Sequence, residues 1–398
     1  MSTQHHADHP TVDLPRGFRA YVTNIGIKDT TNDFVVVAGD HECAAAGLFT
    51  LSSFAGPSVQ VSREHVASGA ARAVVVISKN ANVATGPEGL ANAREVVSTV
   101  AEALRCEPTD VLIASTGVIG RQYPMDAVRK GLAAIPSPLP GTDATLVANG
   151  ITTTDTVSKV AVAHAGEARI VGVAKGVGMI EPNMATLITL IFTDAAVAPE
   201  QLDAITRRVI GATFNCVSID TDTSTSDTAI VLASGAAGPV DLDEFEVALH
   251  DVALSLTKQV ARDGEGATTL IEAHVDGAST VEMARHVAKA IVNSPLVKTA
   301  IHGADPNWGR VAMAVGKSSS GNPTDSDYVD QSEVVIRFGE QEVYPAAVDA
   351  SGLAALADYM RGDEVRIHVS LGRGESAGTA WGCDLTDGYV RINADYTT

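Results

Sequence analysis

Short apolar runs of β-branched residues alternate with longer amphipathic stretches along the whole chain, and this alternation limits the fold more than any other feature. Runs such as FVVVA (34–38), AVVVIS (73–78) and VLIAS (111–115) are typical of buried strands. Between the last two, residues 88–105 carry apolar side chains at helical spacing. Because both periods occur in both halves, we expect an α/β or α+β layered sandwich rather than a separate dinucleotide-binding unit.

The same patterns predict the remaining elements. Residues 158–163 and 170–174 flank Ala165-Gly166 as a predicted hairpin, and the polar segment 317–332 is the most linker-like stretch. Further strands are expected at 187–193, 333–338 and 364–370, and further helices at 199–212, 241–262 and 280–292.

Composition and charge narrow the class of protein. Hydrophobic residues make up 45% of the 398 residues but aromatic residues only 4%, so Ala, Val, Ile and Leu must fill the core. The formal net charge of −20 repels phosphate backbones and anionic lipid. We therefore expect neither a nucleic acid nor a membrane as partner.

Cysteines and the N-terminus point to the cytoplasm. The four cysteines are scattered without metal-ligand spacing, which favours free thiols in a reducing compartment. Residues 1–15 are polar and lack the apolar core of a signal peptide, so we expect a disordered tail. The three histidines of this tail are His5, His6 and His9, and they could bind metal loosely. We expect no metal or cofactor to take part in the protein's function.

The most informative stretch is AKGVGMIEPNMATLITLIFTD (174–194), in which a glycine-containing loop leads through Ala185-Thr186 directly into an apolar strand. A threonine hydroxyl that attacks the preceding carbonyl converts the Ala185–Thr186 amide into an ester, which water then opens. The cut leaves Thr186 with a free α-amine of unperturbed pKa about 7.7–8.0, able to act as base for its own hydroxyl. Taken alone, an Ala-Thr pair is more often an ordinary start of a strand.

A family resemblance decides between these interpretations. The block KGVGMIEPNMATL (175–187) resembles the self-cleavage and nucleophile signature of the ornithine acetyltransferases, also called glutamate N-acetyltransferases. Further blocks resemble the family in the same order across almost the whole chain: GLFT (47–50), NAN (80–82), TG (85–86), STGVIG (115–120), TTDT (153–156), DTST (222–225), DGEGA (263–267), NSPLVKTA (293–300), DPNWGR (305–310) and NADYTT (393–398).

The resemblance implies an N-terminal-nucleophile-like sandwich cleaved into two chains. Fragment 16–185 would carry the oxyanion hole and fragment 186–398 would start at the nucleophile, Thr186, with two copies of each in a heterotetramer. Thr116 and Gly117 match the family's oxyanion pair, which donates hydrogen bonds to the tetrahedral intermediate. The implied substrate-binding residues are Thr153, Lys175, Thr186, Glu265, Asn393 and Thr398.

The implied reaction is a ping-pong transfer of acetyl from N-acetylornithine to glutamate, without cofactor or metal. Lys175 suits a substrate carboxylate and Glu265 an ammonium group. Two alternatives stay open: an aminopeptidase or amidase in which water discharges Thr186, and an acetyltransferase for a specialised-metabolite amino acid. The second is favoured by departures that resemble the paralogue of clavulanic acid gene clusters: SKNANVATG (78–86), RQYP (121–124), TSTSD (223–227) and Glu181.

Several conspicuous residues receive structural interpretations. His302 is expected to be a core histidine with its hydrogen bonds satisfied, and Trp308 a packing residue. Four aspartates in Thr- and Ser-rich surroundings suit turns and caps better than a hard-metal site: Asp155, Asp220, Asp222 and Asp227.

Overall fold

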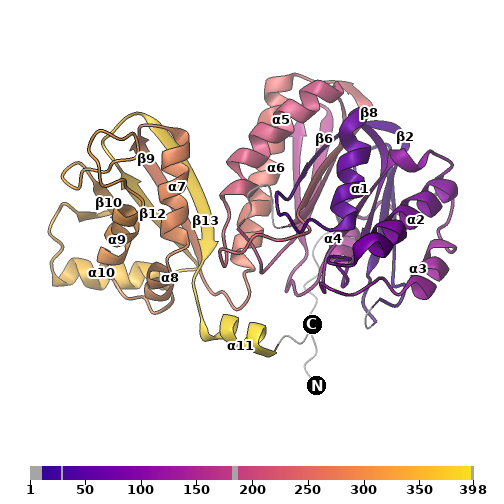
Figure 1. The fold of residues 1–398 in the computed structure, drawn as a ribbon. Coiled ribbons are helices and arrows are strands. Elements are labelled where there is room, and N and C mark those ends of the chain that lie inside the picture. Colours follow the sequence, from indigo (N-terminus) through magenta and orange to yellow (C-terminus); the bar gives the residue numbers. More distant parts are fainter. Residues whose placement is uncertain (1–10, 28–29, 182–186, 396–398) are drawn as a thin grey trace.

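The computed structural model, which describes residues 11–27, 30–181 and 187–395, shows two α/β units side by side (Figure 1). The first unit contains eight strands: β1 (Phe18–Thr23), β2 (Phe34–Phe49), β3 (Ala70–Ile77), β4 (Val111–Ser115), β5 (Lys159–Ala165), β6 (Ala168–Lys175), β7 (Ile188–Ala196) and β8 (Thr228–Pro239). They form one sheet in the order β4-β3-β2-β8-β7-β6-β5, and β1 pairs with β2 outside this path.

Helices cover both faces of this sheet. One face packs against α1 (Pro57–His65), α2 (Gly86–Leu104) and α3 (Met125–Leu132) over β2–β4, and against α5 (Pro199–Ala212) and α6 (Leu242–Arg262) over the remaining strands. The opposite face packs against α4 (Ala144–Ile151). Because the strands are covered on both faces, their sequences are continuous apolar runs rather than alternating ones.

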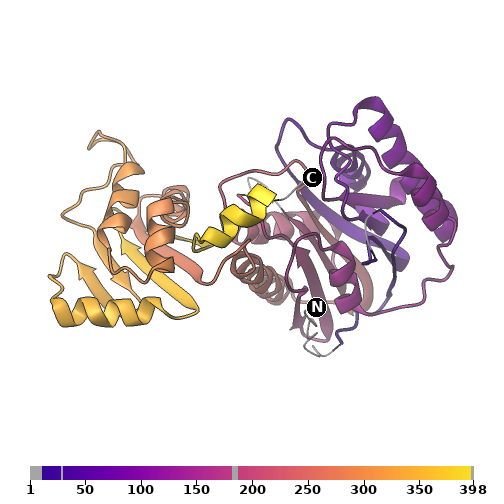
Figure 2. The same ribbon diagram turned by 90° about the horizontal axis from the view of Figure 1, so that it is seen from below.

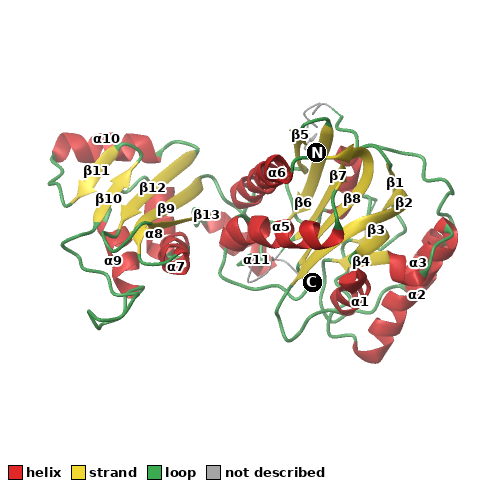
Figure 3. Cartoon of the chain, turned by 90° about the horizontal axis from the view of Figure 1, so that it is seen from above, coloured by secondary structure: helices red, strands yellow, loops and turns green. Residues whose placement is uncertain are grey.

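The second unit is a five-stranded sheet covered on one face (Figure 3). Its strands are β9 (Leu270–Ala278), β10 (Val335–Phe338), β11 (Gln341–Tyr344), β12 (Glu364–Ser370) and β13 (Ser376–Cys383), in the order β11-β10-β12-β9-β13. Helices α7 (Val281–Val292), α8 (Pro295–His302), α9 (Gly309–Lys317) and α10 (Ala350–Met360) contribute to its fold, and α7 packs on β9 and β13. The last helix, α11 (Asp387–Asp395), leaves this unit and runs back toward the first one (Figure 2).

The predicted layered α/β architecture and its elements are confirmed, with two differences. Segment 317–332 is not a linker between units, because the flanking Val315 and Val334 are buried in the same core and the loop joins α9 to β10 within the second unit. The predicted disordered tail, 1–15, also extends too far. Leu14 is buried, and its N–H donates to the Thr142 carbonyl at 2.6 Å. In the described part of the chain, no helix combines the length and the apolar character that crossing a membrane requires.

The predicted cut between Ala185 and Thr186 lies outside the described residues, in the connection from β6 to β7. These two strands are antiparallel neighbours, with Ile170 opposite Thr193 and Lys175 opposite Ile188. Strands of the two predicted fragments, 16–185 and 186–398, therefore interleave in one sheet. Such a sheet can hold both fragments together after a cut.

Candidate active site

One cavity of about 250 Å³ brings together all the predicted site residues that the structure describes. They come from the ends of β4 and β6, from the loops after α4 and α6, and from α11. Leu187 lines the same cavity, and it is bonded to Thr186 through one peptide bond. Ala185, Thr186 and Thr398 lie outside the described residues. The six predicted residues in the wall are Thr116, Gly117, Thr153, Lys175, Glu265 and Asn393.

The predicted oxyanion pair forms a tight turn directly after β4. Gly117 has a φ of +130°, and a Cβ on it would lie 2.2 Å from the carbonyl carbon of Lys79. Only glycine fits this position. The ammonium group of Lys175 donates to the Thr116 hydroxyl oxygen at 3.2 Å. Because that oxygen accepts from Lys175, the hydroxyl hydrogen of Thr116 is available to a group in the cavity.

Lys175 is the buried cation of the cavity, at the last position of β6. Burial lowers its pKa, and the nearby Asp155 and Glu265 carboxylates oppose that shift. Asp155 itself is buried, which raises its pKa, but Lys175 and Lys159 outweigh burial and lower the pKa to about 2. Its carboxylate accepts from Lys159 Nζ at 2.8 Å and from the Gly176 N–H at 2.7 Å. Asp155 pairs with Lys159 and accepts from Gly176, so it fixes the chain where it leaves β6.

Glu265 ties the C-terminal helix to the cavity. Its carboxylate accepts from the Thr154 hydroxyl at 3.2 Å and from the Asn393 amide at 2.9 Å. Gly178 leaves room for it, since a Cβ there would lie 2.6 Å from a Glu265 carboxylate oxygen. The helix α11 thus contributes a wall to a site in the first unit.

Both described ends of segment 182–186 are anchored. The Glu181 N–H donates to the Asp222 carbonyl at 3.0 Å, and its side chain accepts from the Asn293 amide at 2.6 Å. On the other side, the Leu187 carbonyl accepts from the Thr228 N–H at 2.9 Å. The chain therefore leaves and re-enters the described structure beside the 220–228 loop.

Sequence reasoning missed one residue of this cavity. Asp227 directly precedes β8, lines the cavity and is 1% exposed. The Leu187 N–H and the side chains of Ser224 and Thr50 lie close enough to its carboxyl group to lower its pKa, but burial outweighs them. Burial raises its pKa well above the usual value for aspartate. A buried carboxyl group with a perturbed pKa in the wall of a cavity is a candidate functional residue rather than a cap.

The structural interpretations of Asp220 and Trp308 hold, but His302 is not a core histidine, because its side chain is 41% exposed at the end of α8. Asp220 accepts from the Met179 and Ile180 N–H groups, both at 2.7 Å, and so closes a turn. The His302 ring nitrogen Nδ1 lies 2.9 Å from an Asp384 oxygen. Trp308 packs at the edge of the second core, with its ring 5.7 Å from that of Tyr344.

A family model and individual relatives of known name both place this chain in the same family. The ArgJ family matches residues 19–398. The chain is 53% identical over 384 residues to arginine biosynthesis bifunctional protein ArgJ 2 of Nostoc sp., covering 96% of this chain and 98% of that protein. It is also 53% identical over 394 residues to glutamate N-acetyltransferase Oat2 of Streptomyces clavuligerus, covering 98% and 99%. A crystal structure of ArgJ from Bacillus halodurans is 40% identical, with a TM-score of 0.47 over 51% of this chain and 96% of that one. The chain therefore belongs to the ArgJ family of acetyltransferases.

Proposed function

We propose that this protein transfers an acetyl group from N-acetylornithine to glutamate through an acetyl ester on Thr186, after self-cleavage between Ala185 and Thr186. One observation carries the proposal: residues between positions 116 and 393 that the family motif assigns to the site line one cavity next to Leu187. The printed name of the Streptomyces relative, glutamate N-acetyltransferase, agrees with this reaction.

In the first half-reaction, the Thr186 oxygen attacks the acetyl carbonyl of N-acetylornithine while the Thr186 α-amine takes the hydroxyl proton. The Thr116 hydroxyl and the Gly117 N–H donate to the resulting oxyanion. Collapse of the intermediate breaks the carbon–nitrogen bond, and the proton on the α-amine passes to the departing nitrogen. Ornithine leaves, and the acetyl group remains on Thr186.

In the second half-reaction, the amine of glutamate attacks the acetyl ester, and the same groups act in the reverse order. The proton of the attacking amine returns to the Thr186 oxygen through the α-amine. Lys175 and Glu265 place a positive and a negative group in the wall of the cavity. Together they suit an amino acid that carries both charges.

The finer features of the protein follow from the same family assignment. The two fragments stay associated through the β6–β7 pairing and assemble as an α2β2 heterotetramer. The reaction needs no cofactor or metal, and it takes place in the cytoplasm.

Mass spectrometry of the acyl-enzyme tests this function against its rivals. Incubation with N-acetylornithine should raise the mass of the fragment that begins at Thr186 by one acetyl group, at one group per fragment. Glutamate should remove that group much faster than water alone. Discharge by water at the same rate would instead indicate the amidase, and faster discharge by a different amino acid would indicate a specialised-metabolite acceptor.

A further inference from the structure

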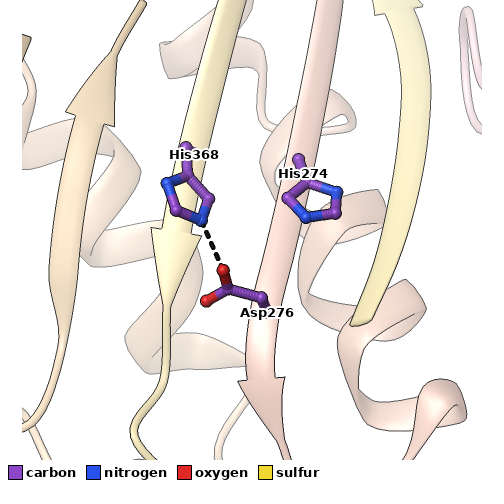
Figure 4. Close-up of side chains that lie close together, drawn as sticks. All are labelled: His274, Asp276 and His368. Carbon is purple, nitrogen blue, oxygen red and sulfur yellow. Dashed lines mark hydrogen bonds and ion pairs between the residues drawn. The ribbon is translucent and has the colours of Figure 1, made fainter. Parts of the chain in front are cut away.

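A cluster of titratable side chains on the second sheet has its hydrogen bonds satisfied by its neighbours. His274 and His368 are paired on the adjacent strands β9 and β12, and Asp276 lies beside them (Figure 4). Nε2 of His368 lies 2.8 Å from the Asp276 carboxylate, and Nδ1 of the same ring lies 3.4 Å from the Arg337 guanidinium. Both nitrogens of His368 therefore have partners, and this cluster joins two strands rather than forming an open set of ligands.

A second cluster is buried next to the active-site cavity and combines two lysines with two aspartates. Lys159 has a fully buried side chain, and its Nζ lies 2.8 Å from the Asp155 carboxylate and 2.5 Å from the Asp263 carboxylate. Asp263 also accepts from the N–H of Thr156 at 3.2 Å and from the hydroxyl of the same residue. Asp263 is thus held to Lys159, which leaves Asp155 to balance the fourth member, Lys175.

Both oxygens of Asp155 accept from the backbone of the cavity wall. One oxygen accepts from the Gly176 N–H at 2.7 Å, and Gly176 directly follows Lys175 in the chain. The other oxygen accepts from the Thr153 N–H at 3.1 Å. Lys175 and Thr153 line the cavity, whereas Asp155 is buried behind them. Asp155 can therefore act on a substrate only through its neighbours.

The charge of Lys175 decides where the hydroxyl hydrogen of Thr116 points. An ammonium group has three donors and no acceptor, so the Thr116 oxygen must accept from it, at 3.2 Å, and the hydroxyl hydrogen stays free for the cavity. A neutral amine has a lone pair and can accept that hydrogen instead. Loss of the Lys175 proton would therefore turn the oxyanion donor away from the cavity.

Several charges act on the buried Lys175. Burial lowers its pKa, and among the surrounding charges Asp155 opposes this shift most strongly. Lys159 adds to the lowering, while Glu265 and Asp227 oppose it less than Asp155 does. Burial raises the pKa of Asp227 well above its usual range, which weakens its negative charge. Asp155, with a pKa of about 2, stays ionised and is the main counter-ion of Lys175.

We propose that Asp155 is a positioning residue that keeps Lys175 positively charged and, through Lys175, keeps the hydroxyl hydrogen of Thr116 on the cavity side. The inference rests on the proposed function, because this hydrogen matters only where an oxyanion forms. It also gives the reaction a specific pH dependence. The oxyanion donor is present while Lys175 is protonated and is lost as the pH rises through the pKa of Lys175.

The pH profile of kcat for ornithine release from N-acetylornithine tests this role. Asp155→Asn removes the negative charge but keeps an oxygen that can accept from Gly176 or Thr153. The pKa of Lys175 should fall further, so the alkaline limb of the profile should move to lower pH by about one unit or more. A purely structural defect would instead lower kcat by the same factor at every pH.

Lys159→Gln should move the same limb in the opposite direction. The variant removes the positive charge that repels Lys175 and releases Asp155 from its ion pair, so the pKa of Lys175 should rise and the alkaline limb should move to higher pH. Damage to the fold does not produce a shift of this sign. If Asp155→Asn does not fold, Lys159→Gln decides alone, and a limb that stays in place or moves to lower pH overturns the proposal.

A Thr116→Ala background shows whether Asp155 acts through Thr116. A shift of one pH unit lowers kcat about tenfold on the alkaline limb. In the Thr116→Ala background the donor is already missing, so adding Asp155→Asn should lower kcat there by much less than about tenfold. An equal loss in both backgrounds would show that Asp155 does not act through Thr116 and would overturn the proposal.

The matched control is Asp220→Asn. Asp220 also accepts from two backbone N–H groups, those of Met179 and Ile180, but its charge is not one of those that act on Lys175 in the described structure. The alkaline limb of this variant should stay at the wild-type position. Wild-type protein that releases ornithine but passes the acetyl group to water rather than to glutamate would contradict the proposed function and leave the pH result intact.

Discussion

Thr186→Ala is expected to give a single full-length chain that transfers no acetyl group. The substitution removes the hydroxyl that opens the Ala185–Thr186 bond and that later carries the acetyl ester. Activity should fall by at least about 10⁴-fold, as is usual when a covalent nucleophile is deleted. Denaturing gels measure the cleavage: the wild type should show two bands, and Edman degradation of the C-terminal fragment should begin Thr-Leu-Ile-Thr-Leu.

Thr186→Ser is the matched control for this variant. It retains a hydroxyl at the same position, so it should still cleave and still form an acetyl ester, although more slowly. Substantial activity in Thr186→Ala would rule out covalent catalysis at this residue. An intact wild-type chain with full activity would rule out the free α-amine as base.

The strands and helices of the first unit could be predicted because burial on both faces leaves a local signal. All five residues of β4, VLIAS, are buried, so the apolar run and the strand coincide at 111–115. The helix at 199–212 begins at Pro199, where a proline costs no hydrogen bond. In such elements, local sequence and tertiary packing require the same residues.

Other elements depend on distant contacts and leave little local signal. The strand β13 has the sequence SAGTAWGC, whose small residues and glycines do not resemble a strand. Gly378 and Gly382 are needed there because a Cβ would meet Arg285 and the Ser218 carbonyl at less than 3 Å. The polar 317–332 segment has the composition of a linker, but composition cannot show that both of its ends enter the same core.

The candidate site could be predicted only through the family resemblance. From the sequence alone, Lys175 and Glu265 would be predicted to be charged surface residues. The structure instead buries Lys175 and places both residues in the wall of one cavity. The asparagine that meets Glu265 comes from the last helix, 128 positions further along the chain. Asp227 was assigned to a turn or cap because its Thr- and Ser-rich neighbours do not reveal that the side chain is buried.

Glu265→Gln provides the contrast for the last prediction, because its charge acts on the bound substrate and the transition state alike. We expect mainly a higher KM for the substrate whose ammonium group meets this side chain, with kcat little changed. The amide is similar in size to the carboxylate and can still accept a hydrogen bond from Thr154 or Asn393. Steady-state kinetics with N-acetylornithine and glutamate measure both parameters.

Thr116→Ala should instead lower kcat by about 10²–10³-fold and leave KM nearly unchanged. The Thr116 hydroxyl is held by Lys175 with its hydrogen free for the cavity, so its bond forms fully only when the carbonyl oxygen becomes an oxyanion. The variant removes this donor, while the Gly117 N–H remains and limits the loss. Because the two variants act on different parameters, they also control for each other. If Thr116→Ala raised KM alone, Thr116 would bind substrate, and its assignment to the oxyanion hole would have to be withdrawn.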